Sequence, residues 1–232
     1  MTDPFSDPVE VQTFGSLVKK SAFSFSKLKL HDQCPSKYKF IHIDKLPEPT
    51  GDAAQRGKII HAELESAIKG ELPLLSGEVQ HLEESIQDWI SFNAQAEMPF
   101  GVDKDWNDVG YDSKDAAFRG IIDLYYEAGD TAVILDFKTG KLRDYIDQLR
   151  AYATAIFAIK PHINRITPQI EFIDLKKRDT YTTIERAEFP AMKVDLGFKF
   201  MAIENDDIFA PNPGFLCRYC HFRKNNGGPC KW

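Results

Sequence analysis

Residues Asp123–Lys141, DLYYEAGDTAVILDFKTGK, determine how this 232-residue chain is expected to fold. Two apolar runs, IIDLYY and TAVILDF, flank the turn sequence EAGD, and this pattern predicts a hairpin of two largely buried strands over residues 118–138. Side chains alternate along a strand, so Asp136 and Lys138 are expected on one face and Phe137 on the other. A carboxylate and an ammonium at the end of a buried strand are costly unless they are paired or bind something.

Asp123, on the neighbouring strand of the hairpin, can supply a second carboxylate. Two acids and a lysine at one strand end suit a metal-dependent phosphodiester hydrolase, because carboxylate oxygens are good Mg2+ ligands and a bound metal activates water. A single aspartate or lysine is more often structural. The hypothesis therefore depends on the residues that accompany the hairpin.

The rest of the chain predicts helices and further strands around this hairpin. Amphipathic periodicity predicts helices over residues 53–69, 77–97, 142–160 and 191–204. Strands are predicted over residues 166–175 and 181–189, joined by a basic turn at 176–178, while residues 98–117 read as irregular. This order predicts an α/β fold with helices flanking a mixed sheet. Residues 1–21 are expected to be a flexible lead-in and residues 22–232 a single domain, with a cysteine-rich region over 211–232.

The composition is that of a globular protein that works inside a cell. The chain is 43% hydrophobic and 28% charged, and no apolar run reaches the roughly 20 residues of a membrane span. Its acidic start lacks the apolar segment of a signal peptide. We therefore expect no membrane partner and a cytoplasmic location, which would be the host cytoplasm if the protein is viral.

The net charge of −6 is unevenly distributed along the chain. Residues 17–45 hold seven lysines against two aspartates, and residues 212–232 hold four basic residues and no acid. Aromatic residues are interleaved with these charges at Phe23, Phe25, Tyr38, Phe40, Tyr219, Phe222 and Trp232. Such segments can contact phosphates and stack on the bases of a single strand, although a merely solvated basic end is the plain alternative.

Four motifs follow one another in a characteristic order: GKIIHAELE, RGIIDLYY, ILDFKTGK and QLRAY, spread over residues 57–152. This order closely resembles the PD-(D/E)XK nuclease superfamily, in its RecB-like branch. The resemblance implies a restriction-endonuclease-like core over most of the chain. It also implies a Mg2+- or Mn2+-dependent deoxyribonuclease, an exonuclease acting on single-stranded DNA or on DNA ends. An endonuclease of the same fold and a non-catalytic DNA-end-binding subunit are the alternatives.

The resemblance assigns metal ligands residue by residue. Asp123 and Asp136 would bind one or two Mg2+ or Mn2+ ions, with His61 as an added ligand. A nitrogen ligand from His61 would shift the preference toward Mn2+. The backbone carbonyl of Phe137 often completes such a shell in this family.

The resemblance also assigns the groups that act on the substrate. Lys138 would orient or help to deprotonate the attacking water and would offset the charge that builds on the phosphate. Gln148 and Tyr152 lie four residues apart on a predicted helix, so both can reach the same place, and they would position the scissile strand.

The four cysteines form a separate pattern, with Cys34 near the start and Cys217, Cys220 and Cys230 at the end. The C-x2-C-x9-C spacing indicates a metal or cluster site, since structural disulfides are rare in intracellular proteins. The pattern is similar to that of iron–sulfur nucleases, namely CRISPR-associated four-cysteine exonucleases and the nuclease domain of AddB-type recombination enzymes.

The similarity to iron–sulfur nucleases implies one [4Fe–4S] cluster that joins the two ends of the chain. The last gap is longer than is typical of those families, so Zn2+ is the alternative. The similarity further implies DNA as the partner, together with proteins of recombination, replication, CRISPR adaptation or phage DNA metabolism.

Overall fold

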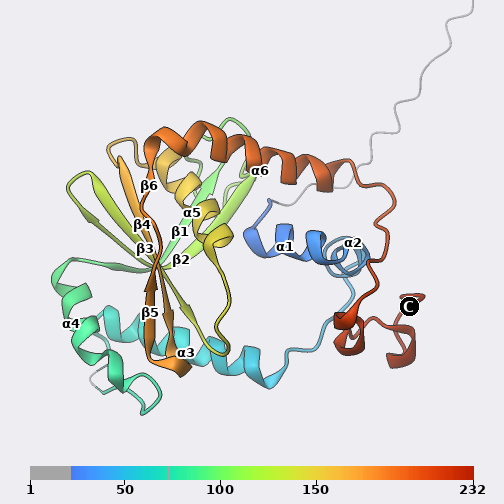
Figure 1. The fold of residues 1–232 in the computed structure, drawn as a ribbon, viewed down its shortest axis with the longest axis horizontal. Helices are drawn as coiled ribbons and strands as arrows, with labels where there is room; N and C mark the ends of the chain where they lie inside the picture. Colours follow the sequence, from blue (N-terminus) through green and yellow to red (C-terminus); the bar gives the residue numbers. More distant parts are fainter. Residues whose placement is uncertain (1–21, 73) are drawn as a thin grey trace, which may run out of the picture.

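The computed structural model describes residues 22–72 and 74–232, and the predicted flexible lead-in over residues 1–21 lies outside the described residues. Its centre is a mixed sheet (Figure 1). The strands are β1 (Gln95–Val102), β2 (Phe118–Ala128), β3 (Thr131–Lys138), β4 (Arg165–Phe172), β5 (Lys177–Thr180) and β6 (Ile184–Glu185). They are ordered β1-β2-β3-β4-β5, and β6 also pairs with β4. Only β3 and β4 run parallel among these described pairs, which confirms the predicted α/β class with a mixed sheet.

Helices cover both faces of the sheet (Figure 1). They are α1 (Phe25–Gln33), α2 (Pro35–Tyr38), α3 (Asp52–Ile68), α4 (Glu83–Ser91), α5 (Ile146–Ile159) and α6 (Phe189–Glu204). Helices α3 and α4 pack on one face around Leu64 and Trp89, while α5 and α6 pack on the other around Leu149 and Leu196. The fold is therefore a three-layer sandwich with a core on each side of the sheet.

The predicted hairpin is present. Strands β2 and β3 are antiparallel, with Leu124 opposite Leu135, and the chain turns through Gly129, whose φ of 65° favours glycine. Phe137 packs against Trp89 of α4, with ring centroids 5.8 Å apart, so it faces the α3–α4 layer. Asp136 and Lys138 lie together on the other face of β3, as the alternation predicts.

The segment before the hairpin differs from the prediction. The helix expected over residues 77–97 is shorter, comprising a 3-10 turn at Gln80–Leu82 and then α4, and it stops before Asn93, whose φ is 54°. Residues Gln95–Val102 instead form β1, which includes part of the segment expected to be irregular. Pairing with β2 outweighs the helical pattern, because it buries Met98, Phe100 and Val102.

Several other predicted boundaries were wrong. The strand expected over residues 166–175 ends at Phe172 and is followed by a 3-10 turn, after which Lys176 adopts a left-handed φ of 48°. Most of the basic turn expected at 176–178 belongs to β5, and only Ile184–Glu185 remain of the strand expected over residues 181–189. Helix α5 begins at Ile146 rather than at residue 142.

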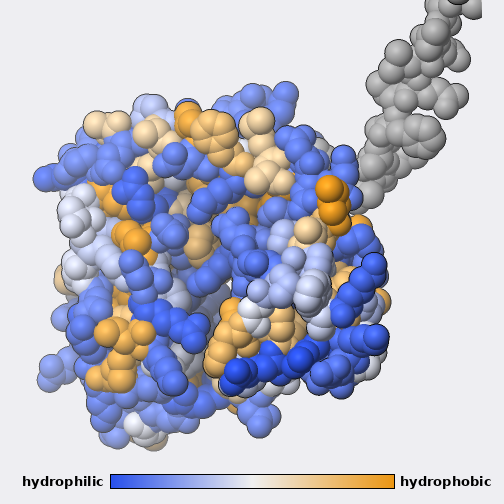
Figure 2. Space-filling model, turned by 45° about the vertical axis from the view of Figure 1, so that its right-hand side comes forward, coloured by the Kyte–Doolittle hydropathy of each residue, from blue (hydrophilic) through white to orange (hydrophobic). Residues whose placement is uncertain are grey.

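The outer surface carries mostly hydrophilic residues, with smaller hydrophobic patches between them (Figure 2). Within residues 22–72 and 74–232, none of the helices combines the length and the hydropathy that a membrane crossing requires.

Candidate active site

The six side chains expected at the site come from four elements and form two adjoining sets, which the backbone of Phe137 links. They are His61 from α3, Asp123 from β2, Asp136 and Lys138 from β3, and Gln148 and Tyr152 from α5. The group lies where β2 and β3 run between the α3 and α5 layers. Its members are up to 91 residues apart in sequence, so the fold itself assembles them.

Asp123 is held by the neighbouring strand. Its Oδ2 accepts a hydrogen bond of 2.7 Å from the backbone N–H of Phe137, and its Oδ1 lies 3.5 Å from Nδ1 of His61. The side chain is largely buried. The hairpin therefore fixes this carboxylate with one oxygen engaged by the backbone and the other directed toward His61.

Asp136 is the most deeply buried acid of the group. Its Oδ1 accepts a hydrogen bond from Gln148 at 2.5 Å, and its Oδ2 forms an ion pair of 2.5 Å with Lys138. Despite this ion pair, Oδ2 receives no well-directed hydrogen bond within the described part of the chain. Burial and the nearby charge of Asp123 raise the pKa of Asp136 to about 7, against the opposing effect of Lys138 and His61.

For Lys138, a neighbouring charge and not burial decides the direction of the pKa shift. Burial alone would lower its pKa, but the charge of Asp136 outweighs burial and raises the pKa of the ammonium group. The same ammonium lies 5.0 Å from the ring centroid of Tyr145, a cation–π contact at the start of α5. Lys138 is therefore a fixed cation beside a buried carboxylate.

His61 uses its two ring nitrogens differently. Nε2 donates a hydrogen bond of 3.0 Å to the carbonyl oxygen of Phe137, while Nδ1 faces Asp123 and, at 3.8 Å, Oε1 of Glu97. Burial would lower the pKa of His61, but hydrogen bonding to Asp123 and Glu97 outweighs burial and raises the pKa to about 10. The Phe137 carbonyl, which the resemblance implied as a metal ligand, here accepts the histidine N–H.

Glu97 is a member of this group that the sequence reasoning missed. It lies in β1, and one donor atom from each of His61, Glu97 and Asp123 lies within 4.8 Å of the other two. The alternation of Ala96, Glu97 and Met98 was the available signal, because a lone acid between apolar residues on a strand faces the opposite side from them. Because residues 77–97 were predicted to be a helix, the alternation that is typical of a strand was not recognised around Glu97.

These donors fit a divalent metal ion. Carboxylate oxygens suit Mg2+ and Mn2+, and an imidazole nitrogen is acceptable to Mn2+. The buried Oδ2 of Asp136 is already paired with the ammonium group of Lys138 at 2.5 Å. Of the expected ligands, His61 and Asp123 bring donor atoms within 4.8 Å of each other and of Glu97, whereas Asp136 is outside this group of the described residues.

Gln148 and Tyr152 line the α5 side of the site. Gln148 Nε2 also lies 3.3 Å from the hydroxyl of Tyr152, and burial raises the pKa of that hydroxyl. Tyr152 packs edge-on against Phe100 of β1. A Cβ at Gly120 would come within 2.7 Å of the Phe100 ring and 3.1 Å of Tyr152, so this glycine lets α5 approach the sheet.

An ion-pair network fixes the loop that follows Lys138. Arg56, at the start of α3, makes two hydrogen bonds to the carboxylate of Asp174, of 2.6 and 3.2 Å. The same carboxylate accepts a hydrogen bond of 2.7 Å from the backbone N–H of Gly140. Asp174 was not expected at the site, because nothing in the sequence shows that it pairs with a residue 118 positions away.

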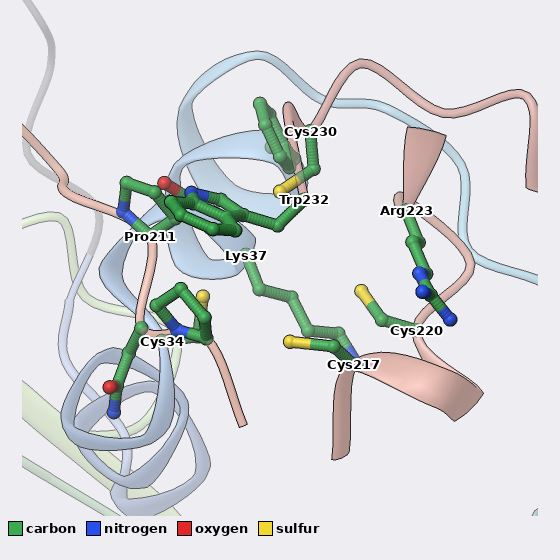
Figure 3. Close-up of a pocket in the computed structure, with 12 residues that line it drawn as sticks. Cys34, Lys37, Pro211, Cys217, Cys220, Arg223, Cys230 and Trp232 are labelled. Carbon is green, nitrogen blue, oxygen red and sulfur yellow. The ribbon is translucent and has the colours of Figure 1, made fainter. Parts of the chain in front are cut away.

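The four cysteines meet at the other end of the molecule. Cys34 follows α1, and Cys217, Cys220 and Cys230 belong to the C-terminal segment, yet all four line one pocket and carry free thiols (Figure 3). Lys37 and Arg223 line the same pocket. Among the described residues, no three of the four sulfur atoms lie within 4.8 Å of one another, so they do not form a closely spaced metal site.

Two solved structures are similar to this chain. A structure of a protein called SSO0001 is 19% identical to this chain, covers 93% of it and 89% of its own length, and has a TM-score of 0.46. A protein from Eubacterium rectale, provisionally assigned as an exonuclease, is 12% identical, with coverage of 95% and 93% and a TM-score of 0.53.

Comparison with family models is more specific than these structural matches. No curated protein sequence matches this chain significantly. The model of the PD-(D/E)XK nuclease superfamily matches residues 22–224, which is most of the chain and includes every residue of the group described above. This chain belongs to the PD-(D/E)XK nuclease superfamily.

Proposed function

We propose that this protein is a Mg2+- or Mn2+-dependent deoxyribonuclease, and that it acts as an exonuclease on single-stranded DNA or DNA ends. The observation that carries this proposal is the placement of His61 beside Asp123, and of Lys138 beside the buried Asp136, on the two neighbouring strands of the hairpin. An acid pair, an imidazole and a fixed ammonium at one place suit phosphodiester hydrolysis better than they suit fold stability.

The residues have separate roles in this proposal. When bound, the metal ion supplies an activated water and stabilises negative charge on the phosphate. Lys138, held by Asp136 and the ring of Tyr145, orients the attacking water and offsets charge that develops on the phosphate. Gln148 fixes the orientation of the Asp136 carboxylate and, with Tyr152, positions the scissile strand.

A second feature bears on DNA as the substrate. A pocket between α1 and α5 is lined by Lys29, Tyr145 and Gln148, although Asp32, Asp144 and Asp147 also line it, so the lysine contacts rather than the net charge of the pocket support the proposal. Lys29 and Lys138 lie on the same tyrosine ring, at 5.6 and 5.0 Å from its centroid. Lysines along a groove that leads to a metal site can contact successive phosphates of a strand.

Digestion of labelled DNA in Mn2+ tests the proposal and separates its alternatives. An exonuclease releases nucleotides from end-labelled linear DNA and leaves circular single strands intact, whereas an endonuclease cuts both. A non-catalytic end-binding subunit binds the linear DNA without cutting it. We expect cleavage of linear DNA alone, and loss of that cleavage in Asp136→Ala.

We further propose that the four cysteines bind one [4Fe–4S] cluster, with Zn2+ as the alternative. Support comes from their shared pocket and from the two cations, Lys37 and Arg223, that would balance thiolate charge. A single Zn2+ with Zn–S bonds of about 2.3 Å needs sulfur atoms roughly 3.8 Å apart. No three of the described sulfurs lie within 4.8 Å of one another, so the four thiols would have to move closer together to share one Zn2+.

A further inference from the structure

Glu97 lies in a position that is unfavourable for a glutamate. Its φ is 50°, in the left-handed region that non-glycine residues rarely adopt. It lies between the paired residues Ala96–Leu124 and Met98–Ile122, so it is level with Asp123 on the adjacent strand. Like charges opposite each other destabilise a sheet. Both features oppose a glutamate here, and neither helps β1 to pair with β2.

The carboxylate of Glu97 reaches the donors already assigned to the metal. Its Oε1 lies 3.8 Å from Nδ1 of His61, and His61, Glu97 and Asp123 each offer a ligand atom within 4.8 Å of the others. His61 donates its Nε2 hydrogen to the Phe137 carbonyl, so Nδ1 is the nitrogen whose proton a metal ion would replace. This is the arrangement of a metal-binding histidine, whose second nitrogen donates to a backbone carbonyl.

Asp136 lies beside this group. Its side chain is only 4% exposed and forms an ion pair of 2.5 Å with Lys138, and the backbone of the next residue, Phe137, contacts both His61 and Asp123. Two acids and one imidazole whose donor atoms lie within 4.8 Å of one another, with a third acid close by in sequence, match the oxygen-rich shell of a hard divalent ion.

We propose that Glu97 is a further ligand of the divalent metal, together with Nδ1 of His61, Asp123 and Asp136. This inference rests on the proposed function, since it concerns the same metal. The competing explanation is that Glu97 only holds His61 through an ion pair and never contacts the metal. The two explanations predict different results when His61 is absent.

Titration calorimetry of the full-length protein with Mn2+ alone, without DNA, tests the proposal directly. Glu97→Gln keeps the shape of the side chain but removes its charge, and we expect Mn2+ affinity to fall by roughly tenfold or more. Glu65→Gln is the matched control, because Glu65 is a nearby carboxylate on α3 that is paired with Lys69 instead. It should change the affinity by less than about threefold.

Glu97→Gly tests whether loss of folding, and not loss of a ligand, explains weaker Mn2+ binding. Glycine adopts a φ of 50° without strain, so the metal-free variant should unfold at the same urea concentration as the wild type or at a higher one. Its Mn2+ affinity should nevertheless fall as in Glu97→Gln. Weakened metal binding in a protein that is no less stable separates a ligand from a structural residue.

The His61→Ala background separates a ligand from a positioning residue. If Glu97 binds the metal itself, Glu97→Gln weakens Mn2+ binding in this background too. If the second substitution has no further effect, Glu97 acts only through His61 and the proposal is wrong. Wild-type affinity in Glu97→Gln would also overturn it, while a wild-type protein that binds no Mn2+ would instead contradict the proposed function.

Discussion

At the scale of single residues, Gly120 shows how closely the site is packed. A Cβ there would lie 2.7 Å from the ring of Phe100, which is buried under α5. We expect Gly120→Ala to lower the free energy of unfolding by about 1–3 kcal/mol, because the ring must move within a packed core. Urea unfolding measures this change.

Gly77→Ala is the matched control for Gly120→Ala. A Cβ at Gly77 would meet no atom within 4 Å, so we expect its stability to stay within about 1 kcal/mol of the wild type. Equal stabilities for the two variants would show that Gly120 does not set the approach of α5 to the sheet.

Several site residues could be predicted from the sequence because local chemistry reveals them. Asp136 and Lys138 are charged residues that interrupt an apolar strand, and His61 stands in an ordered motif. Glu97 and Asp174 could not be predicted in this way. Glu97 was concealed by a helix-like pattern, and Asp174 acts through contacts with Arg56 and Gly140 that only the fold creates.

At the scale of elements, Glu127 joins the end of β2 to the segment after α5. Its carboxylate accepts hydrogen bonds from Tyr125 and His162, each 2.7 Å long, and lies 3.2 Å from Lys160. Burial would raise the pKa of Glu127, but these partners outweigh burial and lower the pKa to about 2 from 4.5. A pKa that is lower in the folded state makes the ionised carboxylate stabilising.

The stability gained through Glu127 should therefore depend on pH. It is fully present above about pH 4.5 and is lost as the pH falls toward 2. We expect Glu127→Gln to be less stable than the wild type near neutral pH, with the deficit shrinking between pH 5 and 2, as measured by urea unfolding at each pH. Glu71→Gln, at an exposed loop residue, should show no such trend, and a deficit that is constant with pH would contradict the expectation.

The hairpin could be predicted and the flanking strands could not, for a physical reason. Strands β2 and β3 are buried, apolar and joined by a glycine turn, so local sequence specifies them. Strand β1 forms because β2 offers a pairing edge, and the short β5 and β6 form because both pair with β4. Such pairings are long-range, and a local pattern does not contain them.

At the scale of the whole molecule, the two basic ends of the described chain meet. Asn212 donates a hydrogen bond of 3.1 Å to the carbonyl of Gln33, and His31 of α1 lies 2.9 Å from Asp206. The C-terminal segment lies beside α2, as Figure 1 shows. The sequence suggested this meeting through its cysteines alone, since no other pattern links residue 34 to residues 217–230.

If the cysteines bind the proposed cluster, it should be detectable through the absorption, the iron content and the melting temperature of the protein. We expect the purified protein to be brown, with broad absorption near 400 nm and about four irons per chain. Cys230→Ser should remove that absorption and lower the melting temperature, because a loop of nearly 200 residues is no longer closed. A colourless protein with one zinc per chain would assign the pocket to Zn2+, and unmodified stability in Cys230→Ser would exclude a structural role for the pocket.

The most direct test of the central claim is the rate at which Mn2+-loaded protein releases nucleotides from end-labelled DNA. We expect Asp136→Ala and Lys138→Ala each to lose at least about 100-fold in rate while remaining folded. Asp130→Ala, at the opposite end of β3, removes an exposed acid paired with Arg165 and should retain the wild-type rate. Wild-type rates in both Asp136→Ala and Lys138→Ala would contradict the account.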